Sequence, residues 1–374
     1  MAKLFTQKSI KLFLIYLIFC SILCLVFLEI IIRFRANFLY GFDKGSISEI
    51  YKIDPKTGLR IPIPNKDIQG KRIHIKINSL GFRGDELDST KQMDTIRLAV
   101  LGASTTFCAE VSENKTTWPE IVKIKLNEKF PNHTFEMING GVPGYGIASS
   151  LINLRHRILH LRPDIIIVYH ATNDISSLSR KAAVEQGLIE KSQNHHGSSL
   201  ASFLCKHSQA FDLIYKNIAI KLRQQNADNS GKLLKFPIEN VSPFVSYLDS
   251  IRIECEQNDI PLVLFTFSTK FRRKQSPKTQ LKNMNTAMYY MPWMAPNTFF
   301  EAFELFNKEM FSFAQQYVNV YVDTLHNSIP GDDEHFVDSV HFTDKGSRRM
   351  AKRVYDALLH KGLIDSVINL KQQN

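Results

Sequence analysis

Three residues of this chain carry the side chains that nucleophilic acyl transfer requires. Ser104 follows an apolar segment, and Asp338 and His341 stand close together much later in the chain. A serine hydroxyl becomes a good nucleophile when a neighbouring base takes its proton, and a carboxylate can orient that base. The pattern predicts Ser104 as the nucleophile, His341 as the general base and Asp338 as the acid that orients the imidazole.

Each of these residues also has an ordinary structural explanation when it is taken alone. Ser104 could cap a helix that begins after a strand. Asp338 could hydrogen-bond to His341 inside a loop, with no catalytic role. The catalytic interpretation therefore depends on a fold that brings the two segments to one place.

Strand-like apolar segments alternate with helical periodicity through most of the chain. The expected strands cover residues 97–101, 135–138, 164–169, 262–267 and 318–322. The expected helices cover residues 118–130, 149–161, 241–257, 299–316 and 343–359, with Thr343 as the N-cap of the last helix. This alternation predicts an α/β fold with a mainly parallel sheet and helices on both faces.

Candidate functional residues follow the first three expected strands. Ser104 comes after the first strand, Gly144 after the second and Asn173 after the third. In open parallel sheets, binding sites collect outside the carboxyl ends of the strands. We therefore expect these three residues to lie close together at one edge of the sheet.

Four sequence blocks together resemble the SGNH (GDSL-type) hydrolase family. The blocks are residues 102–105, 139–144, 172–174 and 338–341. The resemblance covers residues 78 to 359. Its first part, the lead-in at residues 78–84, looks like that of bacterial membrane-anchored members. It implies a three-layer α/β/α sandwich with a five-stranded, flavodoxin-like sheet. It also implies a serine hydrolase that needs no metal and no organic cofactor.

The resemblance further implies an oxyanion hole. Its donors would be the backbone N–H groups of Ser104 and Gly144 and the side-chain amide of Asn173. The side chains of Asn139 and Asp174 would brace the surrounding loops instead of touching substrate.

Two positions depart from the family pattern. Ala103 stands where an aspartate usually precedes the nucleophile, and Ala171 stands where the third block often has glycine. Neither change removes a catalytic group, so activity is still expected.

Residues 12–32 are almost entirely apolar, with three lysines before them and two arginines after them. At about 1.5 Å per residue, their length matches the hydrocarbon core of a bilayer. No small-residue cleavage site follows, which favours an uncleaved signal anchor. The positive charge before the segment favours a cytoplasmic N-terminus, residues 1–11, and a catalytic domain outside the cytoplasm, in the periplasm or on the outer face.

The remaining chain divides into an extension and a large domain. Residues 33–94 are expected to form a linker and N-terminal extension, and residues 95–374 the catalytic domain. Two polar or irregular stretches, at about 176–236 and 269–298, are expected to be insertions in that domain.

The composition narrows the possible partners. The net charge is +11, but no nucleic-acid-binding motif accompanies it, so a basic surface is expected instead of a nucleic-acid partner.

The five cysteines lack C-x-x-C spacing, which leaves open a Cys205–Cys255 disulfide or free thiols. His156 and His160, and the acidic residues 332–335, lack further ligands, so no metal site is expected.

The sequence therefore predicts a membrane-anchored serine esterase. Its substrates would be O-acetyl or short acyl esters of cell-envelope carbohydrate or lipid. Two alternatives share the same sequence features. One is an O-acyltransferase that passes the acyl group to a sugar hydroxyl, and the other is a catalytically inactive scaffold that binds a polymer.

Overall fold

One five-stranded parallel sheet forms the centre of the molecule. The computed structural model describes residues 7–41, 50–88, 90–190, 199–225 and 231–373. The strand order is β6-β5-β7-β8-β9, and all neighbouring strands run parallel. The strands are β5 (Thr95–Gly102), β6 (Thr134–Asn139), β7 (Ile165–Tyr169), β8 (Leu262–Phe265) and β9 (Val320–Asp323). The expected α/β fold with a five-stranded sheet is confirmed.

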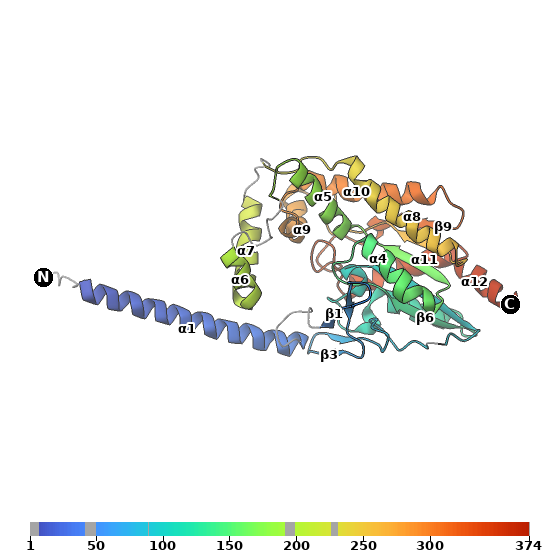
Figure 1. Cartoon of the computed structure of the whole chain (residues 1–374), viewed down its shortest axis with the longest axis horizontal. Helices are drawn as coiled ribbons and strands as arrows, with labels where there is room; N and C mark the ends of the chain where they lie inside the picture. Colours follow the sequence, from blue (N-terminus) through green and yellow to red (C-terminus); the bar gives the residue numbers. More distant parts are fainter. Residues whose placement is uncertain (1–6, 42–49, 89, 191–198, 226–230, 374) are drawn as a thin grey trace.

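Helices cover both faces of this sheet (Figure 1). On one face, α3 (Trp118–Lys129) contacts α11 (Asp344–His360), which is followed by α12 (Leu363–Gln373). On the other face, α8 (Ser242–Glu256) contacts both α4 (Ile147–Asn153) and α10 (Pro296–Ala314). This division follows from right-handed crossovers. From β5 the chain first adds β6 on one side, and it then adds β7, β8 and β9 on the other side, so the connecting helices cover opposite faces.

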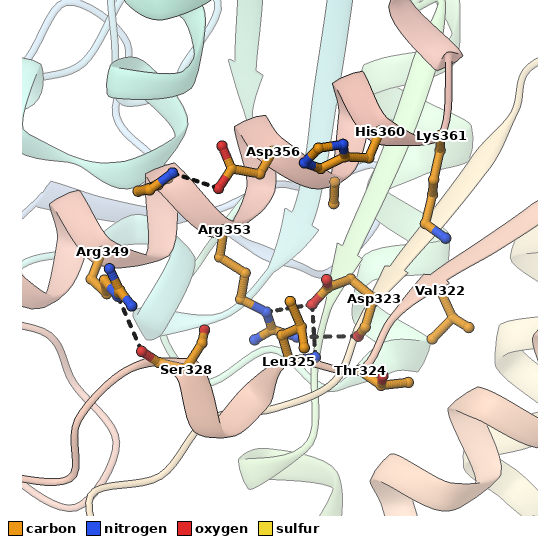
Figure 2. Close-up of a pocket in the computed structure, with 12 residues that line it drawn as sticks. Val322, Asp323, Thr324, Leu325, Ser328, Arg349, Arg353, Asp356, His360 and Lys361 are labelled. Carbon is orange, nitrogen blue, oxygen red and sulfur yellow. Dashed lines mark hydrogen bonds and ion pairs between the residues drawn. The ribbon is translucent and has the colours of Figure 1, made fainter.

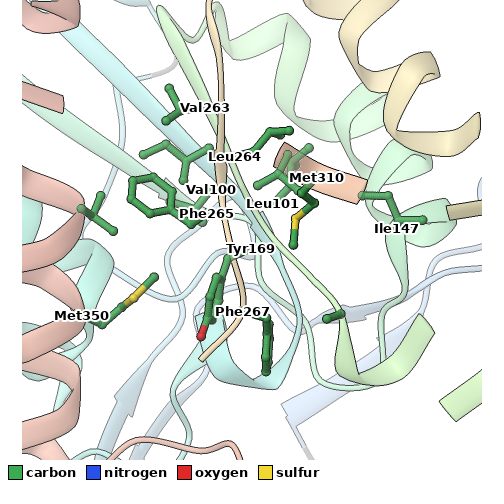
Figure 3. Close-up of a cluster of buried hydrophobic side chains, with 14 of the residues drawn as sticks. Val100, Leu101, Ile147, Tyr169, Val263, Leu264, Phe265, Phe267, Met310 and Met350 are labelled. Atoms are coloured by element: carbon green, nitrogen blue, oxygen red, sulfur yellow. The ribbon is translucent and has the colours of Figure 1, made fainter. Parts of the chain in front are cut away.

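The core lies between the sheet and its two helix layers (Figure 3). All residues of β5, β7 and β8 are buried. Because helices cover both faces, β7, β8 and the part of β5 from Leu98 onward consist of continuous apolar runs instead of alternating ones. Tyr169 at the end of β7 stacks on Phe267, with 4.6 Å between ring centroids. Both rings are buried directly below the edge of the sheet where the candidate site lies.

One expected helix needs correction. The expected helix 149–161 is regular only as far as Asn153. It continues as a π-helical turn (Leu154–Ile158) and a 3-10 turn (Leu159–Leu161). Arg162 then adopts a left-handed conformation, with φ 53°, which ends the helical segment directly before Pro163.

The two stretches expected to be insertions contain regular helices. They hold α5 (Thr172–Glu185), α6 (Ser199–His207), α7 (Gln209–Gln225) and α9 (Pro277–Tyr290). Parts of the first stretch, residues 191–198 and 226–230, lie outside the described residues. Helices α5 and α9 are rich in polar residues, and α6 and α7 expose much of their apolar surface to solvent, so neither pair shows a clear buried face in the sequence.

Before the sheet, the chain forms two antiparallel strand pairs. The pairs are β1 (Tyr51–Ile53) with β2 (Arg60–Pro62), and β3 (Asp67–Gln69) with β4 (His74–Lys76). Their apolar residues pack against Phe107, Val142 and Tyr145 in the large domain. The N-terminal extension therefore belongs to the same packed unit as the candidate site.

A long apolar helix, α1 (Gln7–Tyr40), precedes these strands. Within the described residues, its segment Ile10–Tyr40 is the one helix long and apolar enough to cross a membrane, and none of its most apolar window is buried. This agrees with a membrane anchor or a signal sequence. Cys205 and Cys255 are free thiols in the structure, so the disulfide between them is not formed.

Candidate active site

The fold brings Ser104, His341 and Asp338 together. Ser104 is the first residue of α2 (Ser104–Phe107), directly after β5. Its Oγ lies 2.8 Å from Nε2 of His341. The other ring nitrogen of His341, Nδ1, lies 2.8 Å from Oδ2 of Asp338. These are the two contacts expected of a nucleophile, a base and an acid that orients the base.

The loop that carries Asp338 and His341 is held by its own hydrogen bonds. Oδ1 of Asp338 accepts the backbone N–H groups of Val340 and His341 at 2.9 and 3.0 Å. The Ser339 side chain accepts the backbone N–H of Ala287 in α9 at 3.1 Å. The carboxylate and the imidazole are therefore fixed before a substrate binds.

A buried ion pair fixes the helix that follows this loop. Arg353 of α11 contacts Asp323 at the end of β9, with 2.5 Å between Nε and Oδ1 (Figure 2). Its Nη1 also donates to the carbonyl of Thr266 at 2.9 Å. Arg353 and Asp323 line a cavity that does not include Ser104. They join α11 to the carboxyl ends of two strands, so we assign them a structural role.

The charges around the imidazole favour its protonated form. Burial by itself raises the pKa of Asp338, but hydrogen bonds from His341 and from the backbone lower it to about 2. Burial lowers the pKa of His341, but the negative charges of Glu110 and Asp338 outweigh it and raise that pKa to about 9. Lys216 acts in the opposite direction.

The structure places the three expected oxyanion donors around the same cavity. Ser104, Gly144 and Asn173 all line it. Gly144 has φ +89°, a backbone conformation that residues with a side chain rarely adopt. A Cβ at this position would lie 3.2 Å from Nη2 of Arg60. Nδ2 of Asn173 donates to the carbonyl of Tyr145 at 2.8 Å. Since an amide nitrogen carries two hydrogens, this bond orients the side chain and leaves one hydrogen for a ligand.

Asn139 and Asp174 brace the loops, as the sequence suggested. Nδ2 of Asn139 donates to the carbonyl of Thr106 at 3.0 Å, which ties the end of β6 to α2. Oδ1 of Asp174 accepts the backbone N–H of Ile147 at 2.8 Å, which ties α5 to the start of α4. Burial raises the pKa of Asp174 to about 7.

A second grouping of serine, histidine and aspartate lies behind the site. The Oγ of Ser150 is 2.7 Å from Nε2 of His170, and Nδ1 of His170 is 3.8 Å from Asp174. Burial lowers the pKa of His170 to about 3. Ser150 and His170 are almost completely inaccessible, so a substrate cannot reach this serine.

The cavity contains residues that the sequence did not suggest. It has a volume of about 520 Å³. Arg60 comes from strand β2 of the N-terminal extension, and its side chain donates to the carbonyl of Pro143. Glu110 lies in the loop after α2. No motif marks either residue, because each reaches the cavity through the packing of distant segments.

The aromatic stretch at residues 289–294 is divided between the core and the cavity. Tyr289, Trp293 and Met294 are buried. Tyr290 is 48% exposed and lines the cavity together with Met291. One wall of the candidate site is therefore formed by the end of α9.

Possible metal ligands are paired with other side chains. Asp332 contacts His335, with 2.8 Å between Oδ1 and Nδ1. Asp333 contacts both Lys270 and Lys282. Within the part of the chain that the structure describes, no group of three or more His, Cys, Asp or Glu side chains is placed to hold a metal ion.

The sequence match decides the family. Residues 98–354 match the family model for GDSL-like lipases and acylhydrolases. This range includes every residue of the site named above except Arg60. The chain belongs to the GDSL-like lipase/acylhydrolase family. It is an SGNH-type serine hydrolase that acts on ester bonds. A search of curated protein sequences found no match.

Several solved structures are similar to this chain at low sequence identity. A mutant of an acetyl-xylooligosaccharide esterase from Geobacillus is 12% identical with a TM-score of 0.41, over 70% of this chain and 94% of that one. A lipase/acylhydrolase from Enterococcus faecalis is 14% identical with a TM-score of 0.40, over 71% of this chain and 96% of that one.

Proposed function

We propose that this GDSL-like hydrolase cleaves carboxylic esters through an acyl-enzyme on Ser104. The observation that carries the proposal is the 2.8 Å contact between Oγ of Ser104 and Nε2 of His341. Asp338 occupies the other side of the imidazole, so the ring presents Nε2 to the hydroxyl. A neutral His341 in this tautomer can accept the hydroxyl proton.

The reaction then proceeds in two halves. His341 takes the proton as Oγ of Ser104 attacks the ester carbonyl carbon, and Asp338 stabilises the imidazolium. The tetrahedral intermediate collapses, His341 protonates the leaving alcohol, and the acyl group stays on Ser104. Water then attacks the acyl-enzyme with His341 as base, which releases the acid and restores the serine.

The negative oxygen of each intermediate needs preorganised donors. We assign them to the backbone N–H groups of Ser104 and Gly144 and to Nδ2 of Asn173. The support is that all three line one cavity and that the amide of Asn173 is already oriented. Loss of one such donor typically reduces kcat by about 10²- to 10³-fold.

The proposed substrates are O-acetyl or short acyl esters of cell-envelope carbohydrate or lipid. The cavity, at about 520 Å³, is of the size that holds a small ligand. Its walls combine charged groups from Arg60 and Glu110 with apolar groups from Met291 and Val340. Helix α1 would keep this cavity at a membrane, which favours an envelope substrate.

Steady-state kinetics with p-nitrophenyl acetate test this function. We expect Ser104→Ala to reduce kcat/KM by at least about 10³-fold. Ser246→Ala, at an exposed serine on α8, is the matched control and should retain wild-type kinetics. Equal turnover by wild type and Ser104→Ala would disprove the acyl-enzyme. A parallel reaction with a sugar acceptor reports acyl transfer, because an acyltransferase would form the acylated sugar instead of acetate.

A further inference from the structure

Helices α6 and α7 form a hairpin that is fastened to the apolar helix α1. Glu29 of α1 accepts the hydroxyl of Ser208, in the turn of the hairpin, at 2.8 Å. The same carboxylate accepts backbone N–H groups from the first two residues of α7 at 3.1 and 2.9 Å. Arg33 pairs with Glu29 at 2.6 Å and donates to the carbonyl of His207 at 3.1 Å. A carboxylate at a helix N-terminus is a stabilising cap, so this attachment is specific.

The attachment lies at a defined level along α1. The apolar segment of α1, residues 12–32, is about 30 Å long as a helix, which equals the thickness of the hydrocarbon core of a bilayer. Glu29 lies three residues, about 4.5 Å along the helix, before the end of this segment. The hairpin therefore meets α1 within one helical turn of the point where a spanning helix would leave the lipid. Figure 1 shows the hairpin running across the direction of α1, between the N-terminal part of that helix and the domain.

The hairpin exposes an unusual amount of apolar surface. On α6, Leu200 and Phe203 are 65% and 58% exposed. On α7, Leu213, Ile214 and Ile218 are 50%, 42% and 53% exposed. Leu200 and Phe203 share one side of α6, Ile214 and Ile218 share one side of α7, and Leu213 lies at the edge of that side. Contiguous exposed apolar patches are rare on proteins surrounded by water and mark interaction sites.

We propose that the α6–α7 hairpin is a membrane-binding element that lies in the surface of the bilayer that α1 crosses, on the side of the catalytic domain. Its apolar residues would enter the region between headgroups and acyl chains. Lys206 and His207 lie in the last turn of α6, next to the attachment point, where basic side chains favour anionic headgroups. The occupant of the apolar face is therefore lipid, in continuity with the apolar surface of α1.

The hairpin also contacts the wall of the cavity. The ammonium group of Lys216 on α7 lies 5.4 Å from the ring centroid of Tyr289 and 5.7 Å from that of Tyr290. Tyr290 lines the cavity that contains Ser104. Lys216 stands on the opposite side of α7 from Ile214 and Ile218. If the proposed function holds, the hairpin keeps the mouth of the cavity at the lipid surface, where acyl esters carried by membrane lipids are accessible.

Quenching by brominated lipid tests the membrane contact without measuring turnover. The full chain is reconstituted in nanodiscs of phosphatidylethanolamine and phosphatidylglycerol, with and without bromine on the acyl chains. Phe203→Trp and Ile214→Trp each add one tryptophan to the two native ones, which are buried. We expect brominated lipid to remove about half of the added emission.

Phe311→Trp is the matched control, because Phe311 is a 45% exposed phenylalanine on α10. Its added emission should persist in brominated lipid and fall with aqueous iodide. The proposal is overturned if the hairpin tryptophans behave like this control. It is also overturned if they are shielded from both quenchers and the protein is a dimer in the nanodisc, because the face would then bind a second copy. Unchanged thermal unfolding of each variant shows that the fold is retained.

Discussion

The reactivity of Ser104 depends on the protonation state of one imidazole. His341 can act as a base only when it is neutral, yet its pKa is raised to about 9. Among the groups that oppose the effect of burial, Glu110 has the largest effect on the pKa of His341, and burial in turn raises the pKa of Glu110. The cavity therefore contains an acidic residue that helps to set the pH range of the hydrolase.

This arrangement predicts an alkaline enzyme whose pH profile depends on Glu110. Because neutral His341 forms as the pH rises toward about 9, kcat/KM should increase with pH and level off above that value. Glu110→Gln removes a negative charge that favours the protonated ring, so the rising limb should move to lower pH. Measurement of kcat/KM across pH tests this expectation.

Glu128→Gln supplies the control for this profile, because Glu128 is an exposed carboxylate on α3 and does not line the cavity. Its profile should match that of wild type. A profile of Glu110→Gln that is unchanged, or that moves to higher pH, would show that Glu110 does not act on His341.

The two departures from the family pattern are accommodated by backbone contacts. Ala103 is buried, and its carbonyl accepts the N–H of Phe107 at 2.9 Å, which starts α2 without help from a side chain at position 103. Ala171 is also buried, and its carbonyl accepts the N–H of Ile175 at 2.8 Å. Neither alanine displaces a group from the triad or from the proposed oxyanion hole.

At the scale of elements, the N-terminal extension supports the nucleophile. Arg83 is buried in the lead-in before β5, and its Nη1 donates to the carbonyls of Phe107 and Cys108 at 3.0 and 2.5 Å. Its Nε donates to Oδ1 of Asn114 at 2.9 Å. One side chain therefore satisfies the carbonyls at the end of α2. The lead-in, residues 78–84, therefore supports the helix that carries Ser104 through the side chain of Arg83.

Arg83→Met is expected to destabilise the protein by about 2–4 kcal/mol, because it leaves the buried carbonyl of Phe107 without a donor and that of Cys108 with the N–H of Val111 alone. It should also lower kcat/KM, since α2 carries Ser104. Thermal unfolding of the detergent-solubilised chain and ester kinetics measure the two effects. Arg155→Met is the control, because Arg155 forms an exposed ion pair with Glu254 and its loss should cost less than about 1 kcal/mol. Equal unfolding temperatures for both variants would contradict this role of Arg83.

Elements with a strong local signal were predictable from the sequence. The central strands were found because buried parallel strands contain long apolar runs. Thr343 caps α11 as expected, and its Oγ1 accepts the N–H of Gly346 at 3.1 Å. Ser104, Asp338 and His341 were identified by type and order. Arg60 and Glu110 were not, because only tertiary packing brings them to the cavity. The contact between the α6–α7 hairpin and Glu29 was missed for the same reason, since it joins segments far apart in sequence.

At the scale of the whole molecule, we propose that α1 anchors the hydrolase in a membrane and so sets where it works. We propose that its N-terminus is cytoplasmic and that residues 95–374 lie outside the cytoplasm. A reporter enzyme that is active only outside the cytoplasm, fused after residue 374, should therefore be active. The same fusion without residues 7–41 should be inactive, since it lacks the apolar helix. Activity of a cytoplasmic reporter at the same position would reverse the proposed orientation.

The central claim is that Ser104 is a nucleophile activated by His341, and labelling with a fluorophosphonate tests it most directly. This reagent reacts with serines that an adjacent base activates. The account predicts that the folded wild-type chain is labelled on Ser104, that Ser104→Ala is not labelled, and that His341→Ala reacts far more slowly. A folded wild-type chain that resists labelling, or a Ser104→Ala variant that is labelled as fast as wild type, would contradict it.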